Sequence, residues 1–433
     1  MLGDMRAPRW PSRRTCAAVG AGLLVAGCAA TAGPTSAASR PADSGIGPIS
    51  FATGQVDTGY LQALVSQWNT RHPAQRVTPI YLPDVANDQY AQLVANLQAH
   101  SSVYDVMSLD VIWTAEFASN GWITPLADQV IPAGQFLRPA VETATYQGHL
   151  YAVPFTSNAE LLYYRSDLLA AAHLEPPQTW AELAGDAMAL GARYHLDGYG
   201  GQFQSYEGLT VNFAEAVQSA GGALISGGAP AVDSPQASEA LSFLVSGFRD
   251  GWIPRAALGW NEEASRRAFE AGSLLFLANW PYVYGDASVP GAGNVVAGKF
   301  GVTTLPGLNG PGSATLGGAN LAISAYSRHP ATALAFIRFL TSAASERYIL
   351  IHSALPPVWA SMYNQAALVA MFPFLPVLKQ AILTARPRPA LVDYNQFSLA
   401  ISSAVHQALA QRISVGAALA QLSAELRQIV RAG

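Results

Sequence analysis

The sequence predicts an α/β protein in which helices cover a mainly parallel sheet. Three short apolar runs, at residues 47–51, 77–82 and 103–109, have the length of strands. Between them lie two segments, 60–68 and 90–97, whose apolar residues recur at helical spacing. This strand–helix–strand order supplies the crossovers that parallel pairing requires, so a mainly parallel sheet is expected.

A second region with its own elements begins near Leu161. Residues 179–182 read Thr-Trp-Ala-Glu, which is a capping box with Thr179 at the N-cap and Glu182 at N3. The box predicts that a helix starts here. Glycine-rich loops and turns are predicted at 200–208, 221–222 and 227–228.

The rest of the chain continues this alternation. A helix is predicted at 264–271, where Gly272 ends it, and strands follow at 274–277 and 300–305. The later elements are a glycine-rich connection at 307–318, a helix at 331–340 and a closing helix marked by Val415, Leu419, Leu422, Leu426 and Ile429. We find no internal repeat and no coiled-coil pattern.

The N-terminus has the layout of a secretory signal that ends in a lipoprotein box. Four arginines precede an apolar run at 17–26, and residues 24–28 read Leu-Val-Ala-Gly-Cys. The run is too short to span a bilayer and is typical of a signal peptide. We expect residues 1–27 to be removed and Cys28 to carry a lipid. The alternative is an ordinary signal peptide, but the remaining cysteine, Cys16, leaves with the signal, which favours lipidation.

Residues 28–45 are predicted to form a flexible tether, because they are rich in small residues and proline and contain little bulky apolar surface. The protein is therefore expected outside the cytoplasm, lipid-anchored to the outer face of the cell membrane and not spanning it. With one cysteine in the mature chain, no disulfide is expected.

The charge balance argues against nucleic acid as a partner. The whole chain has a formal charge of −4, and residues 1–27 carry four arginines and one aspartate, so the chain from Cys28 onward has a charge of −7. No basic patch is available to neutralise phosphates. Half of the residues are apolar, and the length of 433 residues suggests two domains or more.

Motifs of the common enzyme classes are absent from the sequence. There is no phosphate-binding loop, no His-Glu-x-x-His pair and no Gly-x-Ser-x-Gly elbow. The eight histidines are scattered, so no metal site and no cofactor are expected. Glu262 and Glu263 form a carboxylate pair, but neighbours on a helix point in different directions.

A set of motifs runs in order along the mature chain, at residues 104–110, 113, 116, 121–126, 151–155, 162–165, 177–183, 268–272, 279–281 and 301–307. With these motifs, most of the mature chain resembles the extracellular solute-binding proteins of carbohydrate ABC importers, in the maltose-binding-like branch called family 1. The stretch 105–122 resembles actinobacterial lipoproteins that bind trehalose or amino sugars.

This resemblance implies a two-lobe fold of the periplasmic-binding-protein, or Venus-flytrap, type. Each lobe would hold a mainly parallel sheet, and crossing strands would join the lobes beside a central ligand cleft. The implied crossings lie near 155–160, 305–312 and 348–356. The implied domains are lobe 1, at 46–156 and 306–348, and lobe 2, at 157–305 and 349–433.

The resemblance also implies a function. The protein would capture a sugar, either a disaccharide such as trehalose or an amino sugar or oligosaccharide, and deliver it to a membrane permease. We expect a monomer without enzyme activity. A secreted glycoside hydrolase stays open as the alternative, since paired acids about 5–10 Å apart converge only in space. Within the binding class, a peptide, polyamine or metal receptor also stays open.

A sugar site needs two kinds of side chain. Carboxylates, amides and arginine bind hydroxyls by directed hydrogen bonds, and aromatic rings cover the apolar faces of the sugar. Such residues are expected after strands, where open α/β sheets place their ligands. Asp110 follows the strand at 103–109 and either binds ligand or caps the next helix. Asn158, beside the first crossing, either binds ligand or shapes a turn.

Aromatic and acidic candidates lie further along the chain. Trp113 either stacks on the sugar or packs in the core. Trp280 and Tyr282 follow the strand at 274–277, and we expect one of them to face the ligand. Glu207, in the loop at 200–208, is either a ligand contact or a solvated acid.

The remaining candidates come from glycine and from a stiff loop. Gly317 and Gly318 either let a ligand approach the backbone closely or form a simple turn. Arg388 lies between two prolines that would hold its guanidinium over the cleft, and we prefer it to Arg386. Tyr394 and Phe397 follow as stacking groups. Weaker candidates at the opposite rim are Gln55 and Asp57.

Overall fold

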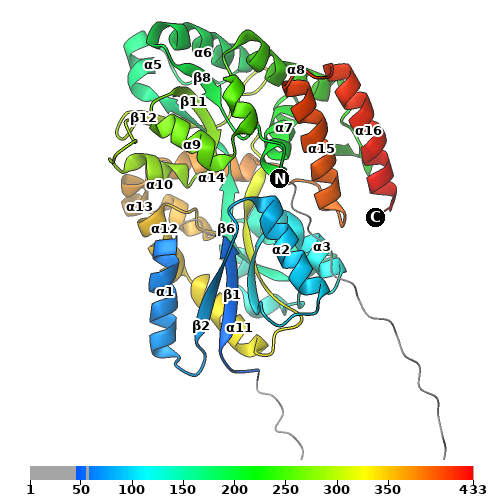
Figure 1. Cartoon of the computed structure of the whole chain (residues 1–433). Helices are drawn as coiled ribbons and strands as arrows, with labels where there is room; N and C mark the ends of the chain where they lie inside the picture. The colour runs from blue at the N-terminus through cyan, green and yellow to red at the C-terminus, as the bar shows by residue number, and fades with distance from the viewer. Residues whose placement is uncertain (1–44, 55–57, 433) are drawn as a thin grey trace, which may run out of the picture. The chain divides into compact units, whose positions relative to one another are not determined.

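The computed structural model of the chain describes residues 45–54 and 58–432. Several predictions fall outside the described residues: the signal segment, the lipidation site Cys28, the tether up to residue 44, and the rim candidates Gln55 and Asp57. The described residues form one compact unit, and within it two β-sheets are each packed with helices (Figure 1).

The first sheet has five strands in the order β2-β1-β3-β13-β6. We call this sheet and the helices that pack on it lobe 1. Its strands are β1 (Ile49–Gly54), β2 (Val77–Leu82), β3 (Val106–Asp110), β6 (Ala152–Ala159) and β13 (Leu316–Ile323). Its helices are α1 (Thr58–Arg71), α2 (Ala86–Gln98), α3 (Thr114–Ser119), α4 (Arg138–Thr143), α11 (Pro330–Leu340) and α12 (Ala343–Ser353). A short hairpin, β4 (Thr145–Tyr146) with β5 (His149–Leu150), leads into β6.

The second sheet has four strands in the order β12-β7-β11-β8, and we call it and its helices lobe 2. Its strands are β7 (Leu161–Arg165), β8 (Asp197–Gly200), β11 (Leu274–Asn279) and β12 (Phe300–Thr303). Its helices are α5 (Ser166–Ala172), α6 (Trp180–Tyr194), α7 (Glu207–Ser219), α8 (Pro235–Asp250), α9 (Glu262–Glu270), α10 (Val283–Ser288), α15 (Tyr394–Leu409) and α16 (Val415–Ala432). A small hairpin, β9 (Ile225–Ser226) with β10 (Ala229–Pro230), lies between α7 and α8.

Both sheets are mixed, so the prediction of a mainly parallel sheet in each lobe is wrong. In lobe 1, β1 pairs in parallel with β2 and β3, but β13 is antiparallel to both β3 and β6. In lobe 2, β11 is parallel to β8, whereas β7 is antiparallel to β11 and β12. The physical reason is the route of the chain. The antiparallel strands β13 and β7 enter their sheets from the other lobe, without a crossover helix.

Most predicted elements form close to their expected bounds. The strand at 77–82 is β2, and the strand at 103–109 begins three residues late, because the Asp105 carboxylate accepts hydrogen bonds from Ser50. The capping box forms: Thr179 Oγ1 accepts from the Glu182 N–H at 3.2 Å, and Glu182 accepts from the Thr179 N–H at 3.0 Å. The expected loop at 200–208 is shorter, since α7 begins at Glu207.

Three segments connect the lobes side by side. The first is Glu160, between β6 and β7, and the second runs from β12 to β13. The third lies at Arg386, which pairs with Thr315 of the second segment. The family resemblance implied a third crossing near residues 348–356. In the structure, residues 343–353 are α12, which packs on α1 of lobe 1. Two further helices, α13 (Ala366–Met371) and α14 (Leu375–Thr384), precede the third segment, and α14 packs on β6.

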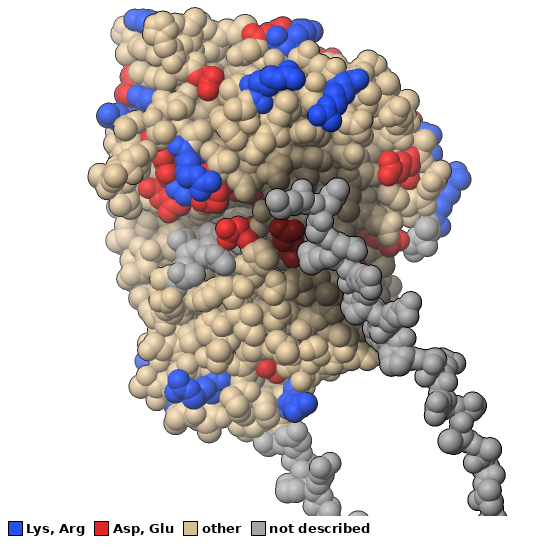
Figure 2. Space-filling view, in the orientation of Figure 1, with Lys and Arg blue, Asp and Glu red and all other residues tan. Residues whose placement is uncertain are grey.

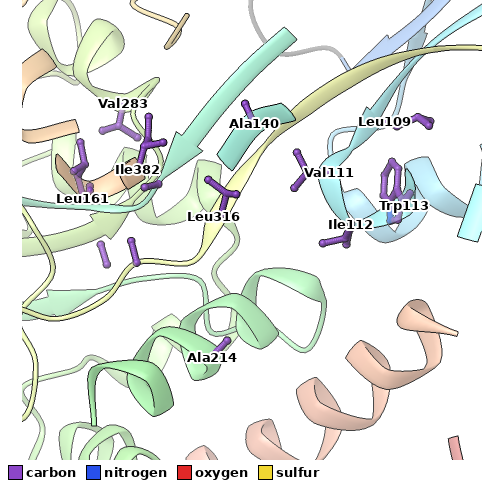
Figure 3. Close-up of a cluster of buried hydrophobic side chains, with 14 of the residues drawn as sticks. Leu109, Val111, Ile112, Trp113, Ala140, Leu161, Ala214, Val283, Leu316 and Ile382 are labelled. Atoms are coloured by element: carbon purple, nitrogen blue, oxygen red, sulfur yellow. The ribbon is translucent and has the colours of Figure 1, made fainter. Parts of the chain in front are cut away.

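The apolar core is continuous through this junction. Leu161 of β7, Leu316 of β13 and Ile382 of α14 are buried there (Figure 3). Apolar stripes from the last helices, including Phe397 of α15 and Leu422 of α16, are buried in lobe 2. Within residues 45–54 and 58–432, no helix combines the length and apolarity that a membrane span requires.

A glycine in β13 tests this architecture. Gly318 has φ of +128°, and a Cβ there would lie 2.2 Å from the Thr156 carbonyl oxygen of the neighbouring strand β6. We expect Gly318→Ala to lower the free energy of unfolding by about 3 kcal/mol, because both the strain and the clash must be relieved. Denaturant unfolding measures this loss. The control is Gly134→Ala, where a Cβ meets nothing within 4 Å and a change within about 0.5 kcal/mol is expected. Equal effects of the two substitutions would contradict the fold.

Candidate functional site

A cavity of about 650 Å³ opens between the two lobes. It lies where β1 and β3 end, beside β6 and β13 and opposite the N-terminal ends of α7 and α9. Carboxyl ends of parallel strands are where α/β sheets place ligands, so the site follows from the topology. Figure 2 shows the surface hollowed between the lobes, with acidic side chains gathered along the hollow.

A buried ion cluster lies at the cavity wall. The Arg388 guanidinium is 1% exposed, with Nη1 2.6 Å from Glu207 Oε1 and Nη2 3.0 Å from Asp110 Oδ1. These residues come from the third connecting segment, the first turn of α7 and the end of β3. Asp110 also accepts from the Ile112 N–H at 3.2 Å, so it caps the short helix that follows β3, and the residue also lines the cavity.

Two residues of α15 donate hydrogen bonds to Glu207. The Tyr394 hydroxyl donates to Glu207 Oε1 at 2.8 Å, and the Ser398 hydroxyl donates to Glu207 Oε2. Burial raises the pKa of Glu207, and Arg388 and Ser398 counteract this rise only in part. Burial alone would lower the pKa of Arg388, but its interactions with Asp110, Tyr394 and Glu207 outweigh burial and raise the pKa above its ordinary value. The arginine therefore stays charged within the cluster.

An aromatic wall stands on the lobe 2 side. Trp280 and Tyr282 follow β11, and both line the cavity. The Trp280 ring lies against Gly317, where a Cβ would be 2.6 Å from the ring, so the glycine makes room for the indole. The Trp280 N–H donates to Asn279 Oδ1 at 2.7 Å, and the Tyr163 hydroxyl donates to the Trp280 carbonyl at 2.9 Å, which fixes the backbone here.

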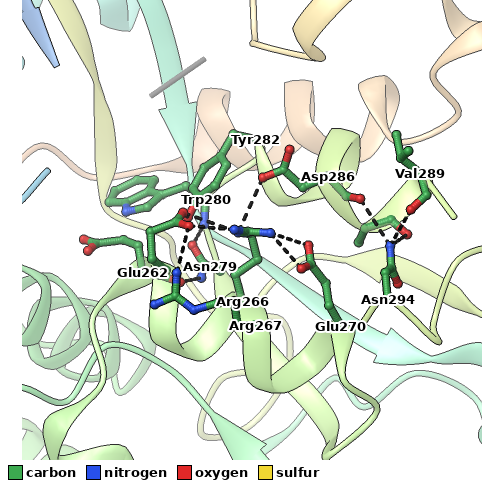
Figure 4. A network of polar contacts seen from close by, with 12 residues as sticks. Glu262, Arg266, Arg267, Glu270, Asn279, Trp280, Tyr282, Asp286, Val289 and Asn294 are labelled. Carbon is green, nitrogen blue, oxygen red and sulfur yellow. Dashed lines mark hydrogen bonds and ion pairs between the residues drawn. The ribbon is translucent and has the colours of Figure 1, made fainter. Parts of the chain in front are cut away.

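A charged network supports this wall from α9 (Figure 4). Arg266 lies 2.6 Å from both Glu263 and Glu270 and 3.4 Å from Asp286. Burial would raise the pKa of Glu263, but hydrogen bonds from Arg266 and Tyr282 outweigh burial, so the pKa is lowered and Glu263 remains ionised.

Glu262 is the neighbour of this network on α9. It accepts from the Tyr206 hydroxyl at 2.6 Å, and burial raises its pKa. Neither Glu262 nor Glu263 was among the predicted site residues. Both line the cavity because they lie in the first turn of α9, where the end of the helix faces the opening.

The structure brings most of the predicted site residues together. The ones that line the cavity are Asp110, Trp113, Asn158, Glu207, Trp280, Tyr282, Gly317, Gly318 and Arg388. Trp113 is 3% exposed and stacks on Phe117, so most of its ring is core. Asn158 Oδ1 is buried without a hydrogen-bond donor among the described residues. Gly318 lies within β13 and pairs with Ser157 of β6, so it does not form the simple turn that was the alternative for this position.

Two aromatic predictions need correction. Phe397 is fully buried in α15 and does not line the cavity, because the helical turn after Tyr394 points it into the core of lobe 2. Tyr394 is 1% exposed and holds Glu207 rather than lining the main cavity. Gln55 and Asp57 lie outside the described residues, although Thr53 and Gly54 before them line the cavity.

Sequence reasoning missed several lining residues. Asp84 follows β2 in the same way as Asp110 follows β3, and that signal could have found it. The others that it missed include Tyr60, Gln89, Ser108, Thr156, Asn261, Arg267 and Asp286. Within the described part of the chain, no three His, Cys, Asp or Glu side chains are grouped so as to hold a metal ion.

A cavity between two α/β lobes that three adjacent segments join defines the class of two-lobed solute-binding proteins. Residues 52–347 match the family of bacterial extracellular solute-binding proteins, and the chain belongs to that family. A relative from Deinococcus radiodurans, a "Probable ABC transporter-binding protein", is 33% identical over 88% of this chain and 93% of its own length.

Two solved structures extend the likeness. Maltose-bound T. maritima MalE3 has a TM-score of 0.84 and 32% identity, covering 88% of this chain and 99% of its own. The GacH receptor of Streptomyces glaucescens GLA.O, solved unliganded and with acarbose, has a TM-score of 0.80 and 25% identity. It covers 89% of this chain and 98% of its own. The fold is therefore the two-lobe fold that the resemblance implied.

The buried arginine provides a test of the site. We expect Arg388→Met to lower the free energy of unfolding by about 3–5 kcal/mol at pH 8, because it leaves the buried Glu207 without its counter-charge. The loss should shrink at pH 4.5, where Glu207 takes up a proton and needs no cation. Urea unfolding at both pH values measures this.

The matched control is Arg386→Met, two residues earlier. Arg386 is exposed and donates to the Gly222 carbonyl at 3.1 Å, so a change below about 1 kcal/mol is expected. A loss for Arg388→Met as small as that of the control would show that the ion cluster does not stabilise the fold.

Proposed function

We propose that the protein is the lipid-anchored, substrate-binding component of an ABC importer and that it captures a neutral sugar for delivery to a membrane permease. The observation that carries the proposal is the set of side chains that line the cavity. Carboxyl groups, an amide and an arginine lie there together with an indole ring, between the two lobes. Directed polar groups suit sugar hydroxyls, and an indole suits the apolar face of a sugar ring. The cavity volume of about 650 Å³ lies within the range of small-molecule sites.

The charge of the cavity favours a neutral ligand over an anionic one. The residues that line it include six acids, Asp84, Asp110, Glu207, Glu262, Glu263 and Asp286, and two arginines, Arg267 and Arg388. The positive charge of Arg388 is already paired with two carboxylates, so it offers little net attraction to a phosphate. Repulsion from this excess of acids would disfavour a phosphorylated sugar.

The size of the ligand is proposed from the same cavity and from the relatives. The two similar structures contain maltose and acarbose respectively. We propose a disaccharide such as trehalose as the first ligand class, with an amino sugar or a longer oligosaccharide as the second. Acidic residues outnumber arginines in the lining of the cavity, and the amino group of an amino sugar would pair with them. This observation supports the amino sugar as the second class.

Capture is proposed to close the lobes about the three connecting segments. A ligand that touches both lobes favours the closed state over the open one, and the closed form would dock on the permease. We propose that α12, α13 and α14 move with lobe 1, because α12 packs on α1 and α14 packs on β6. The protein is proposed to act as a monomer and to leave the sugar unchanged.

The rival class, a glycoside hydrolase, fits the site less well. It needs one carboxyl that donates a proton and a second that attacks or activates water. Asp110 and Glu207 are both bound to Arg388, so a carboxyl oxygen of each is already occupied by a contact within the protein. Incubation with di- and oligosaccharides is expected to leave the sugars intact.

Two substitutions test the assignment of the site. A thermal-shift screen of a sugar panel identifies the best-binding sugar, since a ligand bound only by the folded state raises the melting temperature. We expect Asp110→Asn and Trp280→Ala each to weaken binding of that sugar at least tenfold, or about 1.4 kcal/mol, by titration calorimetry. The control is Asp233→Asn, an exposed acid of lobe 2 that pairs with Arg427. Affinities within threefold of wild type for both variants would refute the assignment.

Membrane anchoring has its own test. We expect Cys28→Ala to move the protein from the membrane fraction to the extracytoplasmic soluble fraction, because the lipid attachment is lost. Cell fractionation and immunoblotting measure this, with wild type as the control. Unchanged membrane retention of the variant would contradict the proposed anchor.

A further inference from the structure

The N-terminal end of α7 makes a hydrogen bond with the opposite lobe. The backbone N–H of Glu207, the first residue of this lobe 2 helix, donates to Asn87 Oδ1 at 3.1 Å. Asn87 lies in the first turn of α2, a helix of lobe 1. Figure 1 shows the two helices on the same side of the molecule, with α7 above α2. We call this contact the inter-lobe bond.

The inter-lobe bond gives α7 an acceptor that its own sequence does not provide. The first N–H groups of a helix have no partner within the helix, and a side chain at the N-cap usually accepts from one of them. At the N-cap of α7, the Tyr206 side chain makes no capping bond, and its hydroxyl donates to Glu262 at 2.6 Å instead. Asparagine is among the best capping residues, and Asn87 supplies this acceptor from the other lobe.

The lobes lie close together around the inter-lobe bond. The space beside it is a cavity of about 10 Å³. Tyr90, Ile112 and Trp113 line this cavity from lobe 1, and Tyr394 and Asn395 line it from lobe 2. It has room for about one water molecule, so bulk water does not surround the bond on this side. A hydrogen bond that is shielded from bulk water is stronger than one in free solution.

The inter-lobe bond also lies at the edge of the main cavity. Ala86 and Gln89, close to Asn87 on α2, line that cavity, and so do Glu207 and Gly208 on α7. Asn87 is not among the lining residues. Walls that belong to different lobes separate when the lobes open, so the bond breaks on opening and forms again on closing. A substitution of Asn87 therefore acts on closure and leaves the lining of the cavity intact.

The Arg388 cluster also bridges the lobes, but in a different place. Its guanidinium is bound to Glu207 of lobe 2 and to Asp110 of lobe 1. Arg388 belongs to the third connecting segment, which is joined to both lobes, and such segments absorb the rotation in hinged proteins. Asn87 lies outside the connecting segments, so its distance from Glu207 responds directly to opening.

We propose that Asn87 is a positioning residue that holds the two lobes closed by accepting a hydrogen bond from the start of α7. The inference deepens the proposed function and rests on it, because closure matters only if the lobes move. The bond joins two groups of the protein, so it favours the closed state both before a sugar enters and afterwards. Its loss shifts the ligand-free protein towards the open state and lets a captured sugar leave faster.

The test follows the Glu207 amide in the ligand-free protein. Asn87→Ala, in lobe 1, removes the acceptor for an N–H in lobe 2. Hydrogen exchange of a peptide from the start of α7, measured by mass spectrometry, is expected to become about fivefold faster, because a capping bond of typical strength is lost. Exchange in α16, elsewhere in lobe 2, should stay unchanged. Small-angle scattering is expected to show a radius of gyration larger by about 1 Å, because the lobes open.

Two further variants complete the design. Asn96→Ala makes the same change on the same helix, and Asn96 Oδ1 accepts from no donor among the described residues, so exchange in α7 and the radius should match wild type. Asn87→Asp keeps an oxygen acceptor and should return exchange in α7 to within about twofold of wild type. This rescue separates loss of the acceptor from a local change in α2.

The result does not depend on which solute the cleft binds, since no sugar is present. A sugar panel without a binder would refute the proposed function and leave the exchange result standing. Exchange in α7 or a radius of gyration that Asn87→Ala leaves at the wild-type value would overturn the proposal. Equal effects of Asn87→Ala and Asn96→Ala would overturn it as well.

Discussion

The buried charge of Arg388 is the constraint on which the site depends. A guanidinium that is 1% exposed is costly to remove from water, and that cost is offset only when carboxylates reach it with good geometry. Here Glu207 and Asp110 do so from α7 and from the end of β3, and these two elements belong to different lobes. The arginine thus fixes the third connecting segment, the start of a helix and the end of a strand at one point. The site forms where these three elements are forced to meet.

This arrangement also sets what the cavity offers to a ligand. Because Arg388 is already paired with Glu207 and Asp110, the groups left for a ligand are hydrogen-bonding oxygens and aromatic surface, which suit an uncharged polar molecule. Hydrogen bonds within the protein already position these groups. Tyr394 and Ser398 donate to Glu207, and backbone hydrogen bonds position Trp280. Side chains that are already ordered lose less entropy on binding, so a site of this kind gains affinity without a large contact area.

Sequence patterns predicted the local features well and the long-range ones poorly. The capping box at Thr179 and the strand at 77–82 depend on neighbouring residues, and both formed as expected. Arg388 was proposed from its flanking prolines, but its partners are more than 180 residues away, and no local pattern indicates them. The antiparallel strands were missed because their direction depends on a chain that crosses between lobes. Glu262 was set aside because periodicity does not show which end of a helix faces a cavity.

The most direct measurement is a crystal structure of the protein with its best-binding sugar. The account predicts a sugar ring on the face of Trp280, hydroxyls within hydrogen-bonding distance of Asp110 or Asn158, and Arg388 still bound to both Glu207 and Asp110. A sugar bound elsewhere, or an arginine that leaves its two carboxylates to bind an anionic group, would contradict the account.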